Sequence, residues 1–276
     1  MQQLYLTDLD HTFLTTQQTI TPYSKKIWNQ LSQKTLLSVA TARSFAKIEE
    51  FLEGMNLNAP LILLDGAMMV SVEKEIIDIH PLEIDLVNAI IHESKKFEME
   101  PFLLSLEERR TLREVFSIPH KLNPYQSHLI DWKYKSDPRL RQTHHIQGLN
   151  DTLKVVYMGE EQPLKQLAEH LKQTFGDNIE AKLSPEHYTG CWFLTILHPL
   201  GDKAHALKKL SEYLNISLEE VTVFGDNIND IEMFKLAGTS VAVNNALNRV
   251  KAEASIVLPH TNDEDAVARY LERIKL

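Results

Sequence analysis

Short apolar runs of strand length alternate with amphipathic segments at both ends of the chain. Near the N-terminal end these runs cover residues 4–6, 36–40 and 61–64, and near the C-terminal end they cover residues 221–224, 239–243 and 255–258. The segments between them carry one apolar stripe each, which predicts helices. The predicted helices begin near Pro22 and Ser44 and cover residues 203–214, 229–237 and about 263–274. This alternation predicts an α/β fold with a doubly wound parallel sheet.

The middle of the chain follows a different pattern. Residues 82–188 carry more charge and more irregular stretches, with strands predicted at 154–157 and 179–183 and a helix at 162–175. We therefore expect a core domain formed by residues 1–81 and 189–276. Residues 82–188 are expected to be an inserted α+β domain.

Composition and charge exclude several classes of protein. The chain has 276 residues, 43% of them hydrophobic, and a formal net charge of −9. The charge disfavours nucleic-acid binding, which needs a basic face. The single cysteine, Cys191, excludes an internal disulfide. No basic leader and no apolar run of about 18 residues is present. We expect a cytoplasmic protein without a membrane or nucleic-acid partner, a monomer or a weak homodimer.

The strongest chemical signal is Asp8-Leu9-Asp10-His11-Thr12, directly after the first predicted strand. Ligand sites in open α/β sheets lie beyond the carboxyl ends of the strands. Two carboxylates this close raise each other's pKa unless a cation compensates them, and oxygen ligands suit Mg²⁺. The alternative is that Asp8 and Asp10 only cap a loop.

A second acidic motif, Gly225-Asp226-Asn227-Ile228-Asn229-Asp230, also follows an apolar strand. Gly225 permits a turn and a close approach of the backbone. Alone, the motif also fits an Asx turn with a helix cap. Together with the first motif, it places four acids at one edge of the sheet and predicts a site for a hard cation.

Two weaker signals concern phosphate binding. Thr41 lies between a predicted strand and a helix, where hydroxyl and backbone N–H groups can hold phosphate. Arg43 offers two parallel donors for a bidentate contact to a phosphate or a carboxylate. A capping Thr41 beside an exposed Arg43 explains the same residues. Lys203 begins a predicted helix, where its charge opposes the helix dipole unless it faces an anion. The alternative is a surface lysine.

In combination, these motifs identify a family. Asp-Leu-Asp-His-Thr, Ala-Thr-Ala-Arg, Lys203 and Gly-Asp-Asn-Ile-Asn-Asp, in this order, resemble the four motifs of the haloacid dehalogenase (HAD) superfamily. The insert resembles, in position, size and order of elements, the C2 cap of its Cof-type sugar-phosphate phosphatases. The resemblance covers essentially the whole chain. It implies a Rossmann-like HAD core, with the cap closing over it to choose the leaving group.

The resemblance also implies roles for individual residues. Asp8 would be the nucleophile that forms an aspartyl-phosphate, and Asp10 the general acid and base. Thr41 and Lys203 would hold the transferring phosphoryl group, with Arg43 and Asn229 beside it as binding residues. The implied Mg²⁺ ligands are Asp8, the backbone carbonyl of Asp10, and Asp226. Asp230 would either bind the ion directly or hold the other ligands in place.

Three positions depart from the family pattern. His11 and Ala42 stand where the family commonly has glycine, and Asp65 stands where Cof-type members usually have asparagine. An acid near a phosphate site either repels the substrate or faces an amine or hydroxyl group on it. These departures affect the choice of substrate and leave the four-motif chemistry intact.

The implied function is Mg²⁺-dependent hydrolysis of small phosphate monoesters, such as sugar phosphates, by a phosphoric monoester hydrolase. A phosphomutase of the same superfamily is one alternative, which net phosphate release would separate from a phosphatase. The other is a non-catalytic regulatory protein that binds a phosphorylated metabolite. The presence of both Asp8 and Asp10 argues against it.

Overall fold

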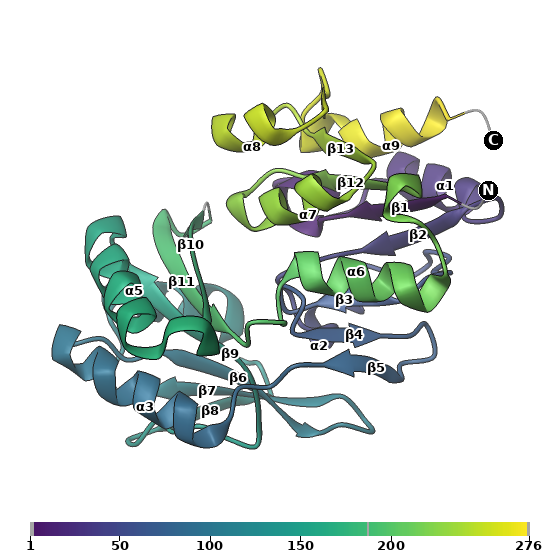
Figure 1. Cartoon of the computed structure of the whole chain (residues 1–276). Coiled ribbons are helices and arrows are strands. Elements are labelled where there is room, and N and C mark those ends of the chain that lie inside the picture. Colours follow the sequence, from purple (N-terminus) through teal and green to yellow (C-terminus); the bar gives the residue numbers. More distant parts are fainter. Residues whose placement is uncertain (1–2, 187, 275–276) are drawn as a thin grey trace. The chain divides into compact units, whose positions relative to one another are not determined.

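The computed structural model of the chain describes residues 3–186 and 188–274. Contacts between residues divide the chain into two compact units (Figure 1). The first consists of Met1–Ile79 and Lys203–Leu276, and the second of His80–Asp202. The second unit therefore extends past residue 188, the predicted end of the insert. The reason is that strand β11 (Cys191–Leu197) pairs with two other strands of this unit.

A five-stranded parallel sheet forms the centre of the first unit. Its order is β14-β13-β12-β1-β2, which confirms the predicted α/β class with a parallel sheet. Every side chain of β1 and of its neighbour β12 is buried or nearly so, as the apolar runs predicted. The strands are β1 (Leu4–Thr7), β2 (Leu36–Val39), β12 (Val221–Gly225), β13 (Thr239–Ala242) and β14 (Ile256–Val257).

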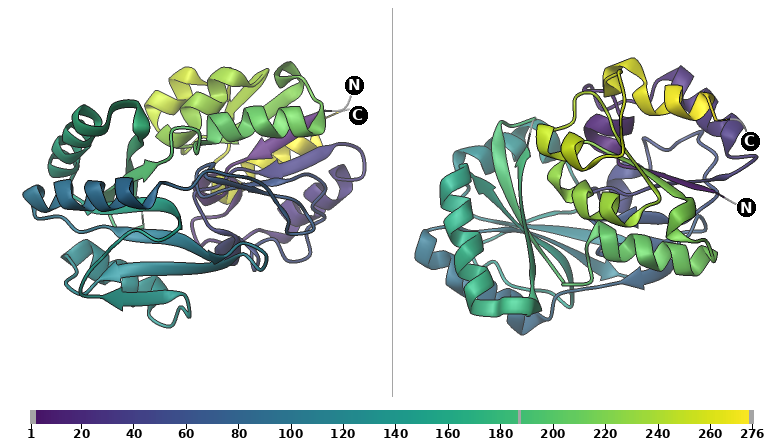
Figure 2. Two further views of the ribbon diagram at one scale, coloured as in Figure 1. Left: turned by 60° about the horizontal axis from the view of Figure 1, so that its bottom comes forward. Right: turned by 45° about the horizontal axis from the view of Figure 1, so that its top comes forward.

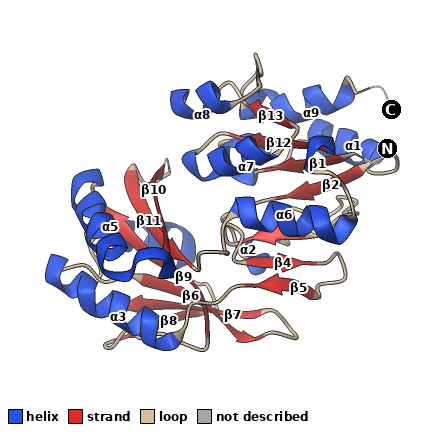
Figure 3. Ribbon diagram, viewed as in Figure 1, coloured by secondary structure: helices blue, strands red, loops and turns tan. Residues whose placement is uncertain are grey.

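Helices cover both faces of this sheet (Figures 2 and 3). Helix α1 packs against α9 and α6 packs against α7. Thr21 caps the first helix by accepting a hydrogen bond from the backbone N–H of Ser24 at 3.0 Å. The helices are α1 (Pro22–Leu31), α2 (Phe45–Ile48), α6 (Lys203–Leu214), α7 (Ile231–Leu236), α8 (Asn248–Glu253) and α9 (Ala266–Glu272).

The third predicted parallel strand has a different setting. Strand β3 (Leu61–Leu63) approaches the edge of the parallel sheet only at the bridge between Ala40 and Ile62. It pairs mainly with β4 (Met68–Val70), which pairs in turn with β5 (Ile76–Ile79), both antiparallel. The turn that follows β3 carries Asp65 and returns to the loop that follows β2, through the hydrogen bond from Asp65 N to Thr41 O at 3.0 Å.

The second unit is built on a six-stranded sheet of order β10-β11-β9-β6-β7-β8, antiparallel except for the last pair. Helices α3 (Ile84–Ser94) and α5 (Glu161–Phe175) bury their apolar stripes with residues of β9 and β11 in one core. A short helix, α4 (Pro124–Leu129), begins at the cap Asn123. The remaining strands are β6 (Phe102–Glu108), β7 (Arg113–Pro119), β8 (Leu140–Thr143), β9 (Asp151–Gly159) and β10 (Glu180–Glu186).

The register of the parallel sheet decides where the acidic motifs lie. Thr7 of β1 stands opposite Phe224 of β12, and the backbone N–H of Asp8 donates to Phe224 O at 3.0 Å. Asp8 and Asp226 therefore leave two paired strands at the same edge of the sheet. Within residues 3–186 and 188–274, no helix combines the length and the apolar character needed to cross a membrane.

Candidate active site

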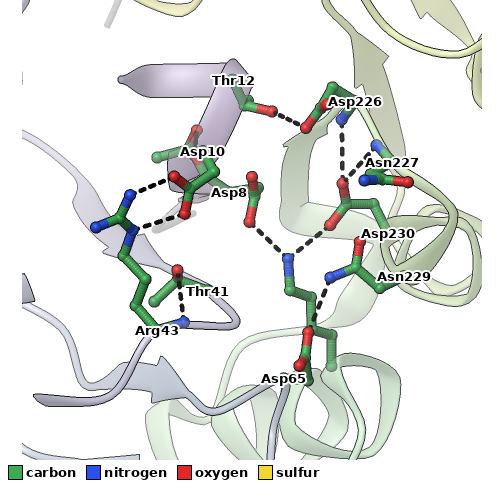
Figure 4. A network of polar contacts seen from close by, with 12 residues as sticks. Asp8, Asp10, Thr12, Thr41, Arg43, Asp65, Asp226, Asn227, Asn229 and Asp230 are labelled. Carbon is green, nitrogen blue, oxygen red and sulfur yellow. Dashed lines mark hydrogen bonds and ion pairs between the residues drawn. The ribbon is translucent and has the colours of Figure 1, made fainter. Parts of the chain in front are cut away.

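Three buried carboxylates meet at the carboxyl edge of the parallel sheet (Figure 4). Asp8 follows β1, and Asp226 and Asp230 lie at and after the end of β12. One oxygen of each lies within 4.8 Å of the others, and no other such cluster of acids, histidines or cysteines occurs in the described part of the chain. Their exposed fractions are 7%, 4% and 0%. Of the four acids in the two motifs, the structure thus brings Asp8, Asp226 and Asp230 into one cluster.

Lys203 is the cation of this cluster. It is fully buried, and its Nζ donates to Asp8 Oδ1 and to Asp230 Oδ1, each at 2.7 Å. Lys203 is the first residue of α6, so the helix carries the ammonium group to the sheet edge. The surface-lysine interpretation of Lys203 is therefore wrong.

Gly225 allows Asp230 to hold the loop after β12. The second carboxylate oxygen of Asp230 accepts from the backbone N–H groups of Asp226 at 3.0 Å and Asn227 at 3.1 Å. A Cβ atom at position 225 would lie 2.5 Å from that oxygen, so only glycine fits there. Gly225 thus serves the close approach that its position in the motif predicted.

Burial and mutual repulsion raise the pKa values of the acids. Burial is the main cause that raises the pKa of Asp8 to about 7; Asp230 and Asp10 raise it further, and Lys203 opposes them. Burial, followed by Asp8 and Asp230, also raises the pKa of Asp226. Burial lowers the pKa of Lys203, but the attraction of Asp230, Asp8 and Asp65 outweighs it and raises that pKa above its ordinary range.

This donor set fits a divalent cation. Three ionised carboxylates facing one ammonium group leave an excess of two negative charges in a buried site, which is costly without a further cation. All the groups offered are oxygens, the ligands preferred by Mg²⁺ and Ca²⁺. Asp8, Asp226 and Asp230 are the side chains able to hold such an ion.

The raised pKa of Asp8 gives a prediction about stability and pH. The folded, metal-free protein retains a proton on Asp8 up to a pH of about 7, whereas the unfolded chain loses it near pH 4. Uptake of a proton by Asp8 therefore stabilises the folded state most at low pH, and this contribution to the free energy of unfolding is lost as the pH rises toward 7. We expect the midpoint temperature of thermal unfolding in EDTA to decrease as the pH is raised from about 5 to about 8.

Thermal unfolding followed by circular dichroism checks this expectation. Asp8→Asn, which lacks the titrating carboxyl group, should show a shallower fall over the same range. A divalent cation binds the ionised carboxylates, so it should raise the midpoint more at pH 8 than at pH 5. Parallel pH curves for the two proteins in EDTA would contradict the prediction.

Asp10 is turned away from the three acids and pairs with Arg43 (Figure 4). Arg43 Nε donates to Asp10 Oδ2 at 2.6 Å, and its Nη2 donates to the other carboxylate oxygen and, at 2.9 Å, to Gln18 Oε1. The guanidinium group also lies over the ring of Phe51, 4.6 Å from its centroid. The predicted phosphate ligand Arg43 is thus part of a bidentate ion pair that orients Asp10.

Thr41 and Asn229, the other predicted binding residues, border the same site. Thr41 is fully buried, and its hydroxyl oxygen accepts from the backbone N–H of Arg43 at 3.1 Å. Asn229 Nδ2 donates to Asp65 Oδ1 at 2.8 Å. All the residues predicted for the site therefore surround one sheet edge, within the first unit.

Sequence reasoning assigned no role to Thr12 and Asn245, which support this edge, and did not predict the backbone conformation of His11. Thr12 Oγ1 donates to Asp226 Oδ1 at 2.9 Å and so fixes that carboxylate. His11 adopts a φ of 55°, in the region that favours glycine, and Asn245 Nδ2 donates to its carbonyl oxygen at 2.7 Å. Asn245 comes shortly after the parallel strand β13, and this position in the sequence indicates that it lies near the carboxyl edge of the sheet.

Sequence comparison places this site in a family. A family model described as haloacid dehalogenase-like hydrolase matches residues 5–271. The chain belongs to this family. The match spans the core motifs and the insert alike, so it confirms the resemblance drawn from the four motifs.

Curated relatives of the chain carry phosphatase names. The pyridoxal phosphate phosphatase YbhA of Escherichia coli (strain K12) is 27% identical over 277 residues, which cover 96% of this chain and 95% of that protein. The HMP-PP phosphatase of Enterobacter sp. (strain 638) is 26% identical over 277 residues, with 98% and 95% covered. These relatives and the family confirm the enzyme class predicted for the hydrolase, that of a phosphoric monoester hydrolase.

Solved structures agree on the fold. A Thermotoga maritima protein matches with a TM-score of 0.78 and 26% identity, over 100% of this hydrolase and 98% of that chain. A Streptococcus mutans protein matches with a TM-score of 0.83 and 21% identity, over 99% and 98%. The α/β architecture of the hydrolase is therefore that of known structures along its whole length.

Proposed function

We propose that this hydrolase is a Mg²⁺-dependent phosphatase that cleaves small phosphate monoesters through an aspartyl-phosphate on Asp8. The observation that carries the proposal is the buried cluster of Asp8, Asp226 and Asp230 with Lys203 bound to two of its members. A carboxylate nucleophile needs neighbouring positive charge to approach a phosphate group. The cluster supplies one cation from the chain and the ligands for another.

In the first step, an oxygen of Asp8 forms a bond to phosphorus while the bond from phosphorus to the leaving oxygen breaks. Asp10, in its protonated form, gives its proton to that leaving oxygen and becomes the carboxylate that pairs with Arg43. In the second step, water attacks the aspartyl-phosphate and gives a proton to Asp10, and the bond between Asp8 and phosphorus breaks. Inorganic phosphate and the alcohol are the products, and both carboxyl groups return to their starting states.

Arg43 and Lys203 have distinct supporting roles in this scheme. Arg43 holds both carboxylate oxygens of Asp10 and so fixes the direction in which Asp10 can exchange a proton. Lys203 orients Asp8 and offsets the negative charge that spreads over the phosphoryl oxygens during transfer. Thr41 is proposed to donate its hydroxyl to the phosphoryl group, and Asn229 borders the same group.

The residues proposed to hold Mg²⁺ are Asp8, Asp226 and Asp230, with the backbone carbonyl of Asp10. When bound, the ion would offset the repulsion between the Asp8 carboxylate and a phosphate dianion. The same charge would make three neighbouring buried carboxylates tolerable in their ionised forms.

The names of two relatives support a substrate class. YbhA is named for pyridoxal phosphate, and YitU of Bacillus subtilis (strain 168), 24% identical over 270 residues, for 5-amino-6-(5-phospho-D-ribitylamino)uracil. We propose a small phosphorylated metabolite of this size as the substrate. We propose that His80–Asp202 acts as the cap that selects its leaving group.

Phosphate release from a panel of small monoesters tests the proposal. The panel should hold sugar phosphates and phosphates of heterocyclic alcohols, each assayed with the wild type and with Asp8→Asn. Net release that needs Asp8 supports a phosphatase. Interconversion of phosphate isomers with little release would instead support a mutase.

Removal of the metal should abolish phosphate release by the enzyme. We expect at least a hundredfold loss of phosphate release after dialysis against EDTA, because three buried carboxylates would then repel the substrate. Added Mg²⁺ should restore the rate, and the wild type without chelation is the control. Full activity in protein shown by elemental analysis to be free of metal would contradict the proposed role of the ion.

A further inference from the structure

Asp65 is an additional acid at the edge of the site, and its backbone is held in an unusual conformation. It is 5% exposed, and both Leu64 and Asp65 have positive φ angles, of 55° and 61°. Hydrogen bonds from Leu64 N to Arg43 O and from Asp65 N to Thr41 O, each 3.0 Å, tie this turn to the loop after β2. The turn therefore presents the Asp65 side chain in a fixed position beside the site.

The first consequence of Asp65 concerns the amide group of Asn229. Asp65 Oδ1 accepts from Asn229 Nδ2 at 2.8 Å. An ionised carboxylate only accepts hydrogen bonds, so the NH₂ end of the amide must face Asp65. The carbonyl oxygen of Asn229 consequently points away from Asp65, on the side of Asp230 (Figure 4). One donor of Asn229 is thus used within the protein, and its acceptor end is turned toward the acid cluster.

The second consequence concerns the charge of Lys203. Lys203 donates to Asp8 and Asp230, and Asp65 adds a third negative charge that attracts the ammonium group. A phosphate anion meets that same negative charge as repulsion. The turned amide and the additional charge act in the same direction, because each makes the surroundings of Lys203 less favourable for an anion.

We propose that Asp65 is a positioning and specificity-determining residue that orients the Asn229 amide and weakens the hold of the site on phosphate. The inference rests on the proposed function and deepens it. Asp65 lowers the affinity for inorganic phosphate as product as well as for the phosphoryl group of the substrate. The site therefore releases phosphate readily and depends more on the leaving group for substrate binding.

The test measures how inorganic phosphate inhibits turnover by the Mg²⁺-loaded enzyme. Asp65→Asn is the main variant, because asparagine has the same size and also tolerates a positive φ. We expect the inhibition constant of phosphate and the KM of a monoester to fall about fivefold to tenfold. Asp177→Asn, which removes an exposed carboxylate in the second unit, is the matched control and should leave both constants unchanged.

A double-mutant cycle separates the effect of orienting the Asn229 amide from the effect of the Asp65 charge. Asp65→Asn should lower the inhibition constant less in an Asn229→Ala background, where only the charge of Asp65 is lost. Equal effects in the two backgrounds would overturn the positioning of Asn229. An inhibition constant that stays the same or rises in Asp65→Asn, in a protein with normal circular dichroism, would overturn the effect of Asp65 on phosphate.

Two further measurements keep the outcome interpretable. Asp65→Gly also suits the positive φ and should change the inhibition constant in the same direction, so a folding defect of one variant does not decide the matter. Calorimetric titration with inorganic phosphate in Mg²⁺ reports the affinity without turnover. A wild type that releases no phosphate would count against the proposed function, while the titration would still test Asp65.

Discussion

Asp8→Asn should reduce phosphate release about ten-thousandfold or more. The amide of asparagine is not a nucleophile toward phosphorus, so the aspartyl-phosphate cannot form. The change keeps the size of the side chain and removes a carboxylate whose pKa burial raises to about 7. The metal-free variant should therefore be at least as stable as the wild type at pH 8, which separates a loss of chemistry from a loss of folding.

The measurement is a single-turnover and steady-state assay of phosphate release with the best monoester of the panel. Unfolding in urea gives the stability of the same preparations. Asp177→Asn, exposed and in the second unit, is the control for an Asp→Asn change as such. Retention of more than a tenth of the wild-type rate by Asp8→Asn would show that Asp8 is not the nucleophile.

The position of the acid cluster is predictable from the sequence because it depends on local patterns. An apolar run predicts a buried strand, and parallel strands place their carboxyl ends at one edge. Asp8 and Asp226 each follow such a run, and the in-register pairing of β1 with β12 brings them together. The same reasoning predicted helix α6, whose bounds, Lys203–Leu214, agree with the prediction.

The pairing of side chains within the site is not predictable in this way. The motif around Arg43 predicts a bidentate contact to a phosphate or a carboxylate, but it does not indicate that the carboxylate is that of Asp10, 33 positions away along the chain. Asp65 and Asn229 are 164 positions apart. Such contacts depend on how loops from different strands pack, and neither periodicity nor motif spacing carries that information.

The limits of the insert show a related difficulty. The sequence places its end at residue 188, whereas the second unit extends to Asp202. Residues 191–197 form an apolar run that fits a strand of either unit. Only their pairing with β9 and β10 assigns them to the second. Strand assignment from pattern alone does not say which sheet receives the strand.

Lys203→Met should destabilise the metal-free protein by about 3–5 kcal/mol, the cost of leaving a buried charge without its partner. Lys203 is fully buried and is hydrogen-bonded to both Asp8 and Asp230. Methionine fills a similar volume but offers no charge, so the three acids would face one another without a cation from the chain. Some of the loss should be recovered at low pH, where the carboxyl groups take up protons.

Urea unfolding in EDTA measures this loss, and Lys208→Met, on an exposed position of the same helix, is the matched control. Repeating both titrations in Mg²⁺ adds a second criterion. A divalent cation held by Asp8, Asp226 and Asp230 would replace part of the missing positive charge. The difference in free energy of unfolding between Lys203→Met and Lys208→Met should therefore be smaller in Mg²⁺ than in EDTA. An unchanged free energy of unfolding for Lys203→Met in EDTA would mean that this lysine does not offset the repulsion among the acids. The electrostatic basis of the proposed mechanism would then be wrong.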